Sequence, residues 1–207
     1  DDCAETAALV RRAGVVGRRA VCDLAEPQQI EALVRDVLAR EGGVDILVNN
    51  AAYQPPVPWD RLDAATLRRM LAVNTEASFL LAQAFARGMV ERGWGRIVNF
   101  TGMNAMHGYA GHSPVSVAKH GVWGLTKALA KEFGPSGITI NAVSPGPIAA
   151  DDDDAAATAR RQDAVARIPL GRLGTPAEVA AVVRMLASDG GAYVTGQMIQ
   201  VNGGGQT

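Results

Sequence analysis

Residues 95–133, GRIVNFTGMNAMHGYAGHSPVSVAKHGVWGLTKALAKEF, predict a short buried strand, a loop and a long helix. The strand covers residues 96–100, which are largely apolar and β-branched and lie between Gly95 and the Thr101-Gly102 pair. Ser113 is a favourable helix N-cap, and Pro114 suits the first helical position because no hydrogen bond is lost there. We therefore expect the helix to begin at Ser113-Pro114.

One lysine stands on the apolar stripe of this helix. Val115, Lys119 and Val122 recur at helical spacing, so Val115 and Lys119 lie one turn apart on the same face. One interpretation is that Lys119 extends its ammonium group along a packed interface towards water. The other is that Lys119 serves a site at the end of the buried strand, and the spacing alone does not choose between them.

Strands and helices alternate along the rest of the chain. We expect a helix that ends at Ala13, strands over 17–23, 44–49 and 138–143, a long helical region over 66–92, and a last helix that begins at Thr175-Pro176. Glu26-Pro27 begins a further helix, which Gly42-Gly43 ends. Its apolar stripe consists of Ile30, Leu33, Val34, Val37 and Leu38. The run 44–49, VDILVN, is typical of a parallel strand covered on both faces. This alternation predicts an α/β fold with a doubly wound parallel sheet.

Composition describes an ordinary globular chain. The 207 residues suffice for one domain, and a net charge of −1 argues against a nucleic-acid partner. No apolar run reaches membrane-spanning length and no signal-peptide pattern is present, so we expect no membrane association and a cytoplasmic location. Cys3 and Cys22 form no disulfide framework, and we expect both to be free thiols.

The strand at 96–100, the loop after it and the run 118–148, AKHGVWGLTKALAKEFGPSGITINAVSPGPI, resemble the active-site half of the short-chain dehydrogenase/reductase family. That family carries a Tyr-x-x-x-Lys pair on this helix and a serine thirteen residues before the tyrosine. Lys119 matches the lysine, whereas Val115 stands in place of the tyrosine and Gly102 in place of the serine. The end of the chain, YVTGQMIQVNGG, also resembles the family's final strand and its Gly-Gly turn.

The resemblance implies a Rossmann-like fold, NAD or NADP as cofactor and a small-molecule substrate. It assigns Lys119 and Asn74 to catalysis, with Asn74 at a local distortion of its helix. The residues that it assigns to the cofactor are Asp23, Leu24, Asn50, Ala51, Lys119, Pro145, Gly146 and Ile148. It also implies a homo-oligomer, a dimer or tetramer, assembled through the helices around Asn74 to Glu91 and Val115 to Phe133.

The family's opening strand, glycine-rich phosphate loop, helix and second strand have no counterpart in residues 1–207. Either the sequence omits this unit or the protein lacks the dinucleotide cradle. Removing the central strand of an open sheet would leave its neighbours unpaired, which is costly, so we favour omission. Residues 1–207 are then one N-terminally incomplete domain.

Valine cannot protonate a carbonyl oxygen, so any reduction needs another acid. Tyr109, His107 and His112 are the side chains of the loop with a suitable pKa range. Three hypotheses follow: a divergent oxidoreductase with its acid in this loop, a non-redox lyase or isomerase that uses Lys119 or a histidine as base, and a catalytically inactive partner subunit.

Two loops complete the expectations. The proline-rich segment 53–60 either lines a substrate entrance or is an inert connector. Residues 149–160 contain four consecutive aspartates, which repel one another, so we expect a solvated lid segment. A metal site there is the alternative, but consecutive carboxylates point in different directions and no histidine lies near, so no metal is predicted.

Overall fold

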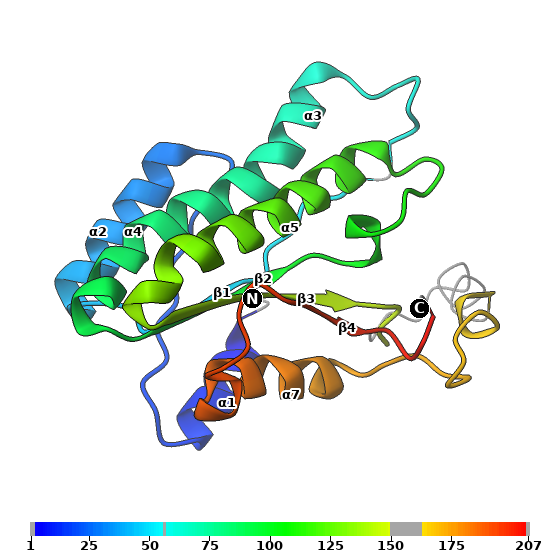
Figure 1. Ribbon diagram of the computed structural model, residues 1–207. Coiled ribbons are helices and arrows are strands. Elements are labelled where there is room, and N and C mark those ends of the chain that lie inside the picture. The colour runs from blue at the N-terminus through cyan, green and yellow to red at the C-terminus, as the bar shows by residue number, and fades with distance from the viewer. Residues whose placement is uncertain (1–2, 56, 150–162, 206–207) are drawn as a thin grey trace.

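A computed structural model describes residues 3–55, 57–149 and 163–205 of the chain (Figure 1). Its described residues form a parallel sheet in the order β1 (Ile46–Asn49), β2 (Gly95–Phe100), β3 (Ile138–Pro145) and β4 (Met198–Val201). Helices α2 (Pro27–Glu41), α4 (Ala77–Arg92) and α5 (Ser113–Phe133) cover one face of the sheet, and α1 (Ala4–Arg12) and α7 (Pro176–Ala187) lie on the other side. The predicted α/β class with helices on both faces is confirmed.

The alternation of side chains along the strands builds a core on each face of the sheet. Ile97 of β2 packs with the helix side chains of α2, α4 and α5, whereas the next residue, Val98, packs with α7. On β3, Ile140 joins the first cluster and Val143 the second. Burial on both faces therefore fixes the central strands and places their carboxyl ends at one edge of the sheet.

Buried amides connect the sheet to α5. Asn49 donates from its side-chain nitrogen to Oδ1 of Asn99 at 2.9 Å, and Asn99 donates to the hydroxyl of Thr126 at 3.0 Å. Thr126 donates in turn to the carbonyl of Val122 within α5 at 2.8 Å. Because an unpaired buried amide is costly, this chain of hydrogen bonds holds α5 in one position over β1 and β2.

The predicted helical region 66–92 is continuous but not uniform. It consists of α3 (Ala64–Leu71), a π-helical turn over Ala72–Glu76, and α4. Asn74 lies in the π-helical turn, where the resemblance to the family placed a local distortion. Short 3-10 turns lie at Met103–Ala105, Gly134–Ser136 and Asp189–Gly191.

Three predictions about the first third of the chain differ from the structure. Residues 17–23 form no strand with any described residue, and Val21 is 90% exposed. The predicted strand 44–49 is present as β1 over residues 46–49, but it is not covered on both faces: Val48 is 42% exposed because β2 is its only paired neighbour in the described part of the chain. Leu38, predicted on the apolar stripe of α2, is likewise more than one-third exposed.

The helix ends agree closely with prediction. Thr175 caps α7 in a capping box with Glu178, and Pro176 is its first residue. In α5 the N-cap is His112 rather than Ser113, a difference of one residue.

Most of the predicted lid lies in residues 150–162, outside the described residues. No described helix is both long and apolar enough to cross a membrane.

Candidate functional site

Lys119 is buried between α5 and the carboxyl end of β2. Its side chain is 3% exposed, and Nζ donates to the carbonyl of Phe100 at 2.9 Å. Burial lowers the pKa of Lys119 from 10.5 to about 8, because the charged form loses its hydration. The interpretation of Lys119 as a side chain that reaches solvent is therefore wrong.

A cavity of about 410 Å³, here called the lysine cavity, opens beside Lys119 at the carboxyl edge of the sheet. It brings together residues that are far apart in sequence. Its wall includes Asn50 after β1, Gly102 after β2, Val115 and Lys119 on α5, Tyr109 from the loop, Pro145 at the end of β3, and Gly146 and Pro147 after it. The cavity therefore places Gly102 and Val115, which stand where the family has its serine and tyrosine, in one wall with Lys119.

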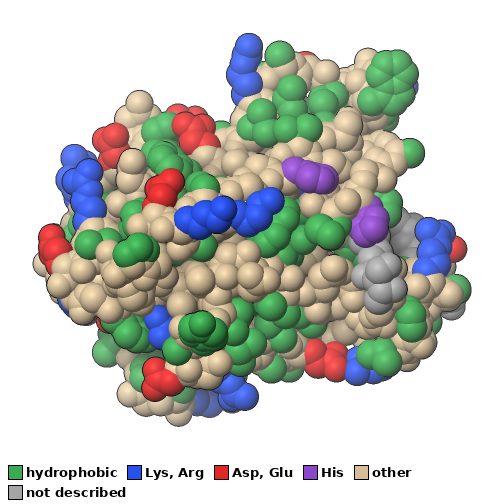
Figure 2. All heavy atoms as spheres, viewed as in Figure 1, with side chains coloured by type: hydrophobic (Ala, Val, Ile, Leu, Met, Phe, Trp, Pro, Cys, Tyr) green, Lys and Arg blue, Asp and Glu red, His purple; other side chains and the backbone are tan. Residues whose placement is uncertain are grey.

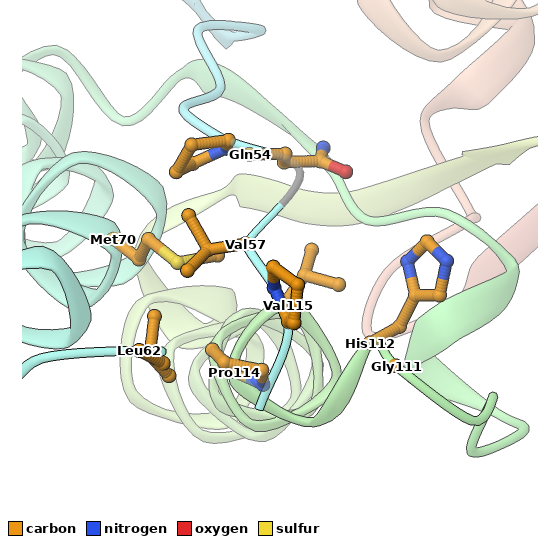
Figure 3. Close-up of a pocket in the computed structure, with 10 residues that line it drawn as sticks. Gln54, Val57, Leu62, Met70, Gly111, His112, Pro114 and Val115 are labelled. Carbon is orange, nitrogen blue, oxygen red and sulfur yellow. The ribbon is translucent and has the colours of Figure 1, made fainter. Parts of the chain in front are cut away.

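A second cavity of about 290 Å³, here called the apolar cavity, lies under the segment 54–62. Figure 3 shows Val57 and Val115 near its middle, Met70 and Leu62 towards one end and His112 towards the other. Gln54 and Val115 belong to the walls of both cavities. Gln54, Pro55, Val57 and Pro58 of the proline-rich segment therefore contribute to a cavity wall, which favours the entrance interpretation over an inert connector.

The structure separates the three proposed acids. Tyr109 lines the lysine cavity, and burial raises the pKa of its hydroxyl. His112 lines the apolar cavity and packs edge-on against Tyr109 with ring centroids 6.4 Å apart. His107 is exposed and contributes to neither cavity wall.

Asn74 lies close to the site without lining either cavity. Its side chain donates to the carbonyls of Tyr53 and Met70 and accepts from the Tyr53 N–H. The adjacent Thr75 donates to the carbonyl of Ala118, the residue before Lys119. Asn74 therefore holds the segment that leads to Gln54, and its π-helical turn touches α5 beside the lysine.

The residues assigned to the cofactor are only partly brought together. Asn50, Lys119, Pro145 and Gly146 share the lysine cavity. Ile148 lines a neighbouring cavity below β1, and Ala51 is exposed next to Asn50.

Asp23 and Leu24 do not line the lysine cavity. The side chain of Leu24 packs against the first core cluster. The carboxylate of Asp23 accepts from the Ala25 N–H and pairs with Arg69 at 2.8 Å, and these two contacts lower its pKa.

Gly102 has a backbone conformation that favours glycine, with φ of 127° and ψ of 169°. A Cβ built on it would meet no other atom within 4 Å, so it faces open space. A side chain here would be opposed by its backbone conformation rather than by its neighbours.

Two polar side chains of the site were not predicted. Gln54 stands in both cavity walls, but it lies in a segment without periodicity, so no sequence signal marks it. Asn104 lines the lysine cavity and lies within hydrogen-bonding distance of the Ser116 hydroxyl, 3.4 Å from it. Its position just after β2 is a usable signal. Within the described ranges, no group of three or more His, Cys, Asp or Glu side chains is placed to hold a metal ion.

Comparison with known proteins identifies relatives of the whole chain. A family model described as Enoyl-(Acyl carrier protein) reductase matches residues 1–206. Nodulation protein G of Azospirillum brasilense is 40% identical over 182 residues, which cover 88% of this chain and 74% of the relative. A 3-oxoacyl-(acyl-carrier-protein) reductase of Vibrio cholerae is 37% identical over 188 residues, which cover 91% and 77%.

Solved structures show the same architecture. A gluconate 5-dehydrogenase from Burkholderia cenocepacia, in complex with NADP and tartrate, superposes with a TM-score of 0.87 and 33% identity, covering 97% of this chain and 80% of that one. An acetoin dehydrogenase from Salmonella typhimurium gives a TM-score of 0.85 and 34% identity with the same coverage of both chains.

Proposed function

The chain belongs to the short-chain dehydrogenase/reductase family, and we propose that it transfers hydride between NAD or NADP and a small carbonyl or alcohol substrate. The observation that carries this proposal is the lysine cavity, where Lys119 and Tyr109 share one wall with Asn50 and the Pro145-Gly146 turn. Relatives that are named reductases and a similar structure that contains NADP support it.

The donors around the lysine cavity fit the nicotinamide-ribose half of a dinucleotide. Lys119 of α5 offers N–H groups suited to ribose hydroxyls, and Asn50, which directly follows β1, offers a side-chain amide in the same cavity wall. The hydrogen bond to Phe100 holds the Lys119 amine in place before binding. A bound dihydronicotinamide would supply the hydride.

Tyr109 is the acid that we assign to this reaction. Its hydroxyl would donate to the carbonyl oxygen of a substrate in the lysine cavity, where Val115 and Gly102 offer no hydroxyl. Because burial raises its pKa, Tyr109 keeps its proton at neutral pH but gives it up reluctantly. We expect slow turnover.

The test is NADH and NADPH oxidation over a panel of small ketones and aldehydes. Tyr109→Phe should lower kcat/KM at least ~100-fold, the usual contribution of a positioned acid. Tyr193→Phe is the matched control, because Tyr193 is fully exposed and lines neither cavity. His112→Ala and His107→Ala complete the series. If the parent protein turns over and Tyr109→Phe matches Tyr193→Phe, Tyr109 is not the acid.

The alternatives make a different prediction for the same panel. A non-redox lyase or isomerase, or an inactive partner subunit, would oxidise neither cofactor with any carbonyl. The buried amine of Lys119 favours the non-redox alternative, since it offers a base with a pKa of about 8. Carbonyl reduction by a Val115→Tyr plus Gly102→Ser protein alone would support one of these two alternatives.

A homo-oligomer and a cytoplasmic location remain predictions. Exposed apolar side chains on α4 and α5 support an assembly through these helices. The exposed fractions are 39% for Phe79 and 42% for Val90 on α4, and 60% for Val117 on α5. On the face shown in Figure 2, apolar side chains lie between charged ones over the helices. Light scattering of the purified protein measures the assembly directly; a monomer would contradict it.

A further inference from the structure

Lys119 is held in an unusual way for a lysine. Within the described part of the chain, its Nζ donates a 2.9 Å hydrogen bond to the Phe100 carbonyl, and no carboxylate forms an ion pair with it. Tyr109 is the other titratable side chain among the described residues of the cavity wall. Burial without a counter-charge lowers the pKa of Lys119 to about 8, so near neutral pH a larger fraction of this amine is neutral than of an ordinary lysine. A neutral amine has a lone pair that can attack a carbonyl carbon.

Space for an electrophile exists beside the amine. Phe100, whose carbonyl holds Nζ, and Gly102, two residues later, both line the lysine cavity. No atom lies within 4 Å of where a Gly102 side chain would begin. One turn before Lys119, Val115 contributes a short side chain to the same wall. The cavity of about 410 Å³ therefore has Lys119 in its wall and open space at Gly102 in the same wall.

We propose that Lys119 is a nucleophile that condenses with a small aldehyde carrying an apolar substituent and forms an imine. The Nζ lone pair forms a bond to the carbonyl carbon, and the carbonyl oxygen gains one proton from the nitrogen to become a hydroxyl. That hydroxyl takes up a second proton and leaves as water while the nitrogen loses its remaining amine proton, which forms the C=N bond. Hydrolysis reverses each step and returns the free amine. No oxidant or reductant is needed.

The apolar cavity indicates the substituent of the aldehyde. It adjoins the lysine cavity through the shared walls of Val115 and Gln54, and its other walls are mostly apolar. An alkyl group directed past Val115 would enter the apolar cavity and contact Val57, Leu62 and Met70. Each buried methylene is worth about fourfold in affinity, as a transfer free energy of about 0.8 kcal/mol implies.

This activity uses the same lysine and the same cavity as the proposed hydride transfer, so it belongs to the protein without a bound dinucleotide, and it needs no acid at Tyr109. It gives the non-redox alternative a definite chemistry, since a protonated imine withdraws electrons from the neighbouring carbon. The two proposals are tested by different signals, which are cofactor oxidation for the first and a covalent adduct for the second.

The chain offers a built-in control, because Lys119, Lys127 and Lys131 are its only lysines. Lys127 and Lys131 lie on the exposed side of α5, whereas Lys119 is buried. Accessibility alone predicts that the two exposed lysines react first. A preference for Lys119 would therefore have to come from its chemistry.

The experiment treats the intact protein with dilute butanal and cyanoborohydride at pH 7.5 and follows the reduced adduct on each lysine by peptide mass spectrometry. We expect the initial rate at Lys119 to exceed those at Lys127 and Lys131 at least tenfold. Acetaldehyde, with two fewer methylenes, should label Lys119 at least fourfold more slowly than butanal. A Lys119 rate equal to or below that of the exposed lysines overturns the proposal, and equal rates with the two aldehydes overturn the assignment of the apolar cavity.

Two variants complete the test. Lys119→Met should remove the fast-labelled site, and Lys127→Met should leave it. Fast adduct formation that persists in Lys119→Met overturns the proposal. The comparison of the three lysines in the parent protein needs no variant, so it holds even where Lys119→Met fails to fold.

Discussion

β1 and β2 are neighbouring strands of similar chemistry with different surroundings. Ile46, Leu47 and Val48 pair in register with Arg96, Ile97 and Val98. Val98 is 1% exposed and Val48 is 42% exposed, although the two valines are direct partners. β2 lies between two strands and two layers of helices, whereas β1 has one paired neighbour in the described part of the chain. Burial of an apolar strand is therefore decided by its neighbours and not by its own sequence.

The functional residues lie where these two regions meet. Lys119 belongs to the packed centre, where little water competes for its hydrogen bond to Phe100. Val48 and Ile148 line a cavity of about 650 Å³, and this cavity shares Asn50, Phe100 and Pro145 with the lysine cavity. The site is therefore buried on the side of α5 and partly exposed on the side of β1.

The largest expected effect tests whether water is excluded from Lys119 in the packed centre, and it is measured as the change of folding stability with pH. The folded-state pKa of Lys119, about 8, lies below the ordinary 10.5, so between these values the unfolded chain binds more protons than the folded one. Stability should therefore rise with pH from about 8 to about 10.5. The gain attributable to Lys119 is on the order of 3 kcal/mol.

This gain is measured as the difference between the parent and Lys119→Met in urea unfolding free energy at several pH values. Below pH 8 the parent should carry the full cost of a buried charge, so the variant should be the more stable of the two there. Parallel pH profiles for the two proteins would show that water reaches Lys119.

The next effect compares the paired valines directly. Val98→Ala removes two buried methyl groups and should lower the free energy of unfolding by about 2 to 3 kcal/mol, by a cavity and transfer effect. Val48→Ala, the same change on the partner residue, should cost well under about 1 kcal/mol because Val48 is already partly hydrated. Urea unfolding at neutral pH measures both. Equal losses would mean that another surface covers β1 in solution.

The elements of the centre were predictable because each carries a local signal. The sequence shows the apolar stripe of α5, the position of Lys119 one turn after Val115 on that stripe, and the Thr175 capping residue of α7. The conformation of residues 17–23 and the exposure of Val48 were not predictable, because both depend on what lies beside them. The role of Gln54 was also hidden, since only the folded chain places it between two cavities.

The smallest effect concerns Gly102, the second residue after the end of β2. Nothing in the sequence indicated that Gly102 would adopt a φ of 127°, which other residues reach only at a cost. Gly102→Ser should therefore lower the free energy of unfolding by about 1 to 2 kcal/mol, although its side chain would meet no neighbour within 4 Å. Gly108→Ser is the matched control, because Gly108 also faces open space and its φ is not in the positive range.

The control should cost less than about 0.5 kcal/mol, so the difference between the two variants isolates the backbone conformation at the end of β2. This difference also bears on the site, since Gly102 lines the lysine cavity. If both variants lose equal stability, the conformation of Gly102 is not strained for serine. A serine, the residue that the family carries at this position, could then be introduced at position 102 without a cost from the backbone conformation.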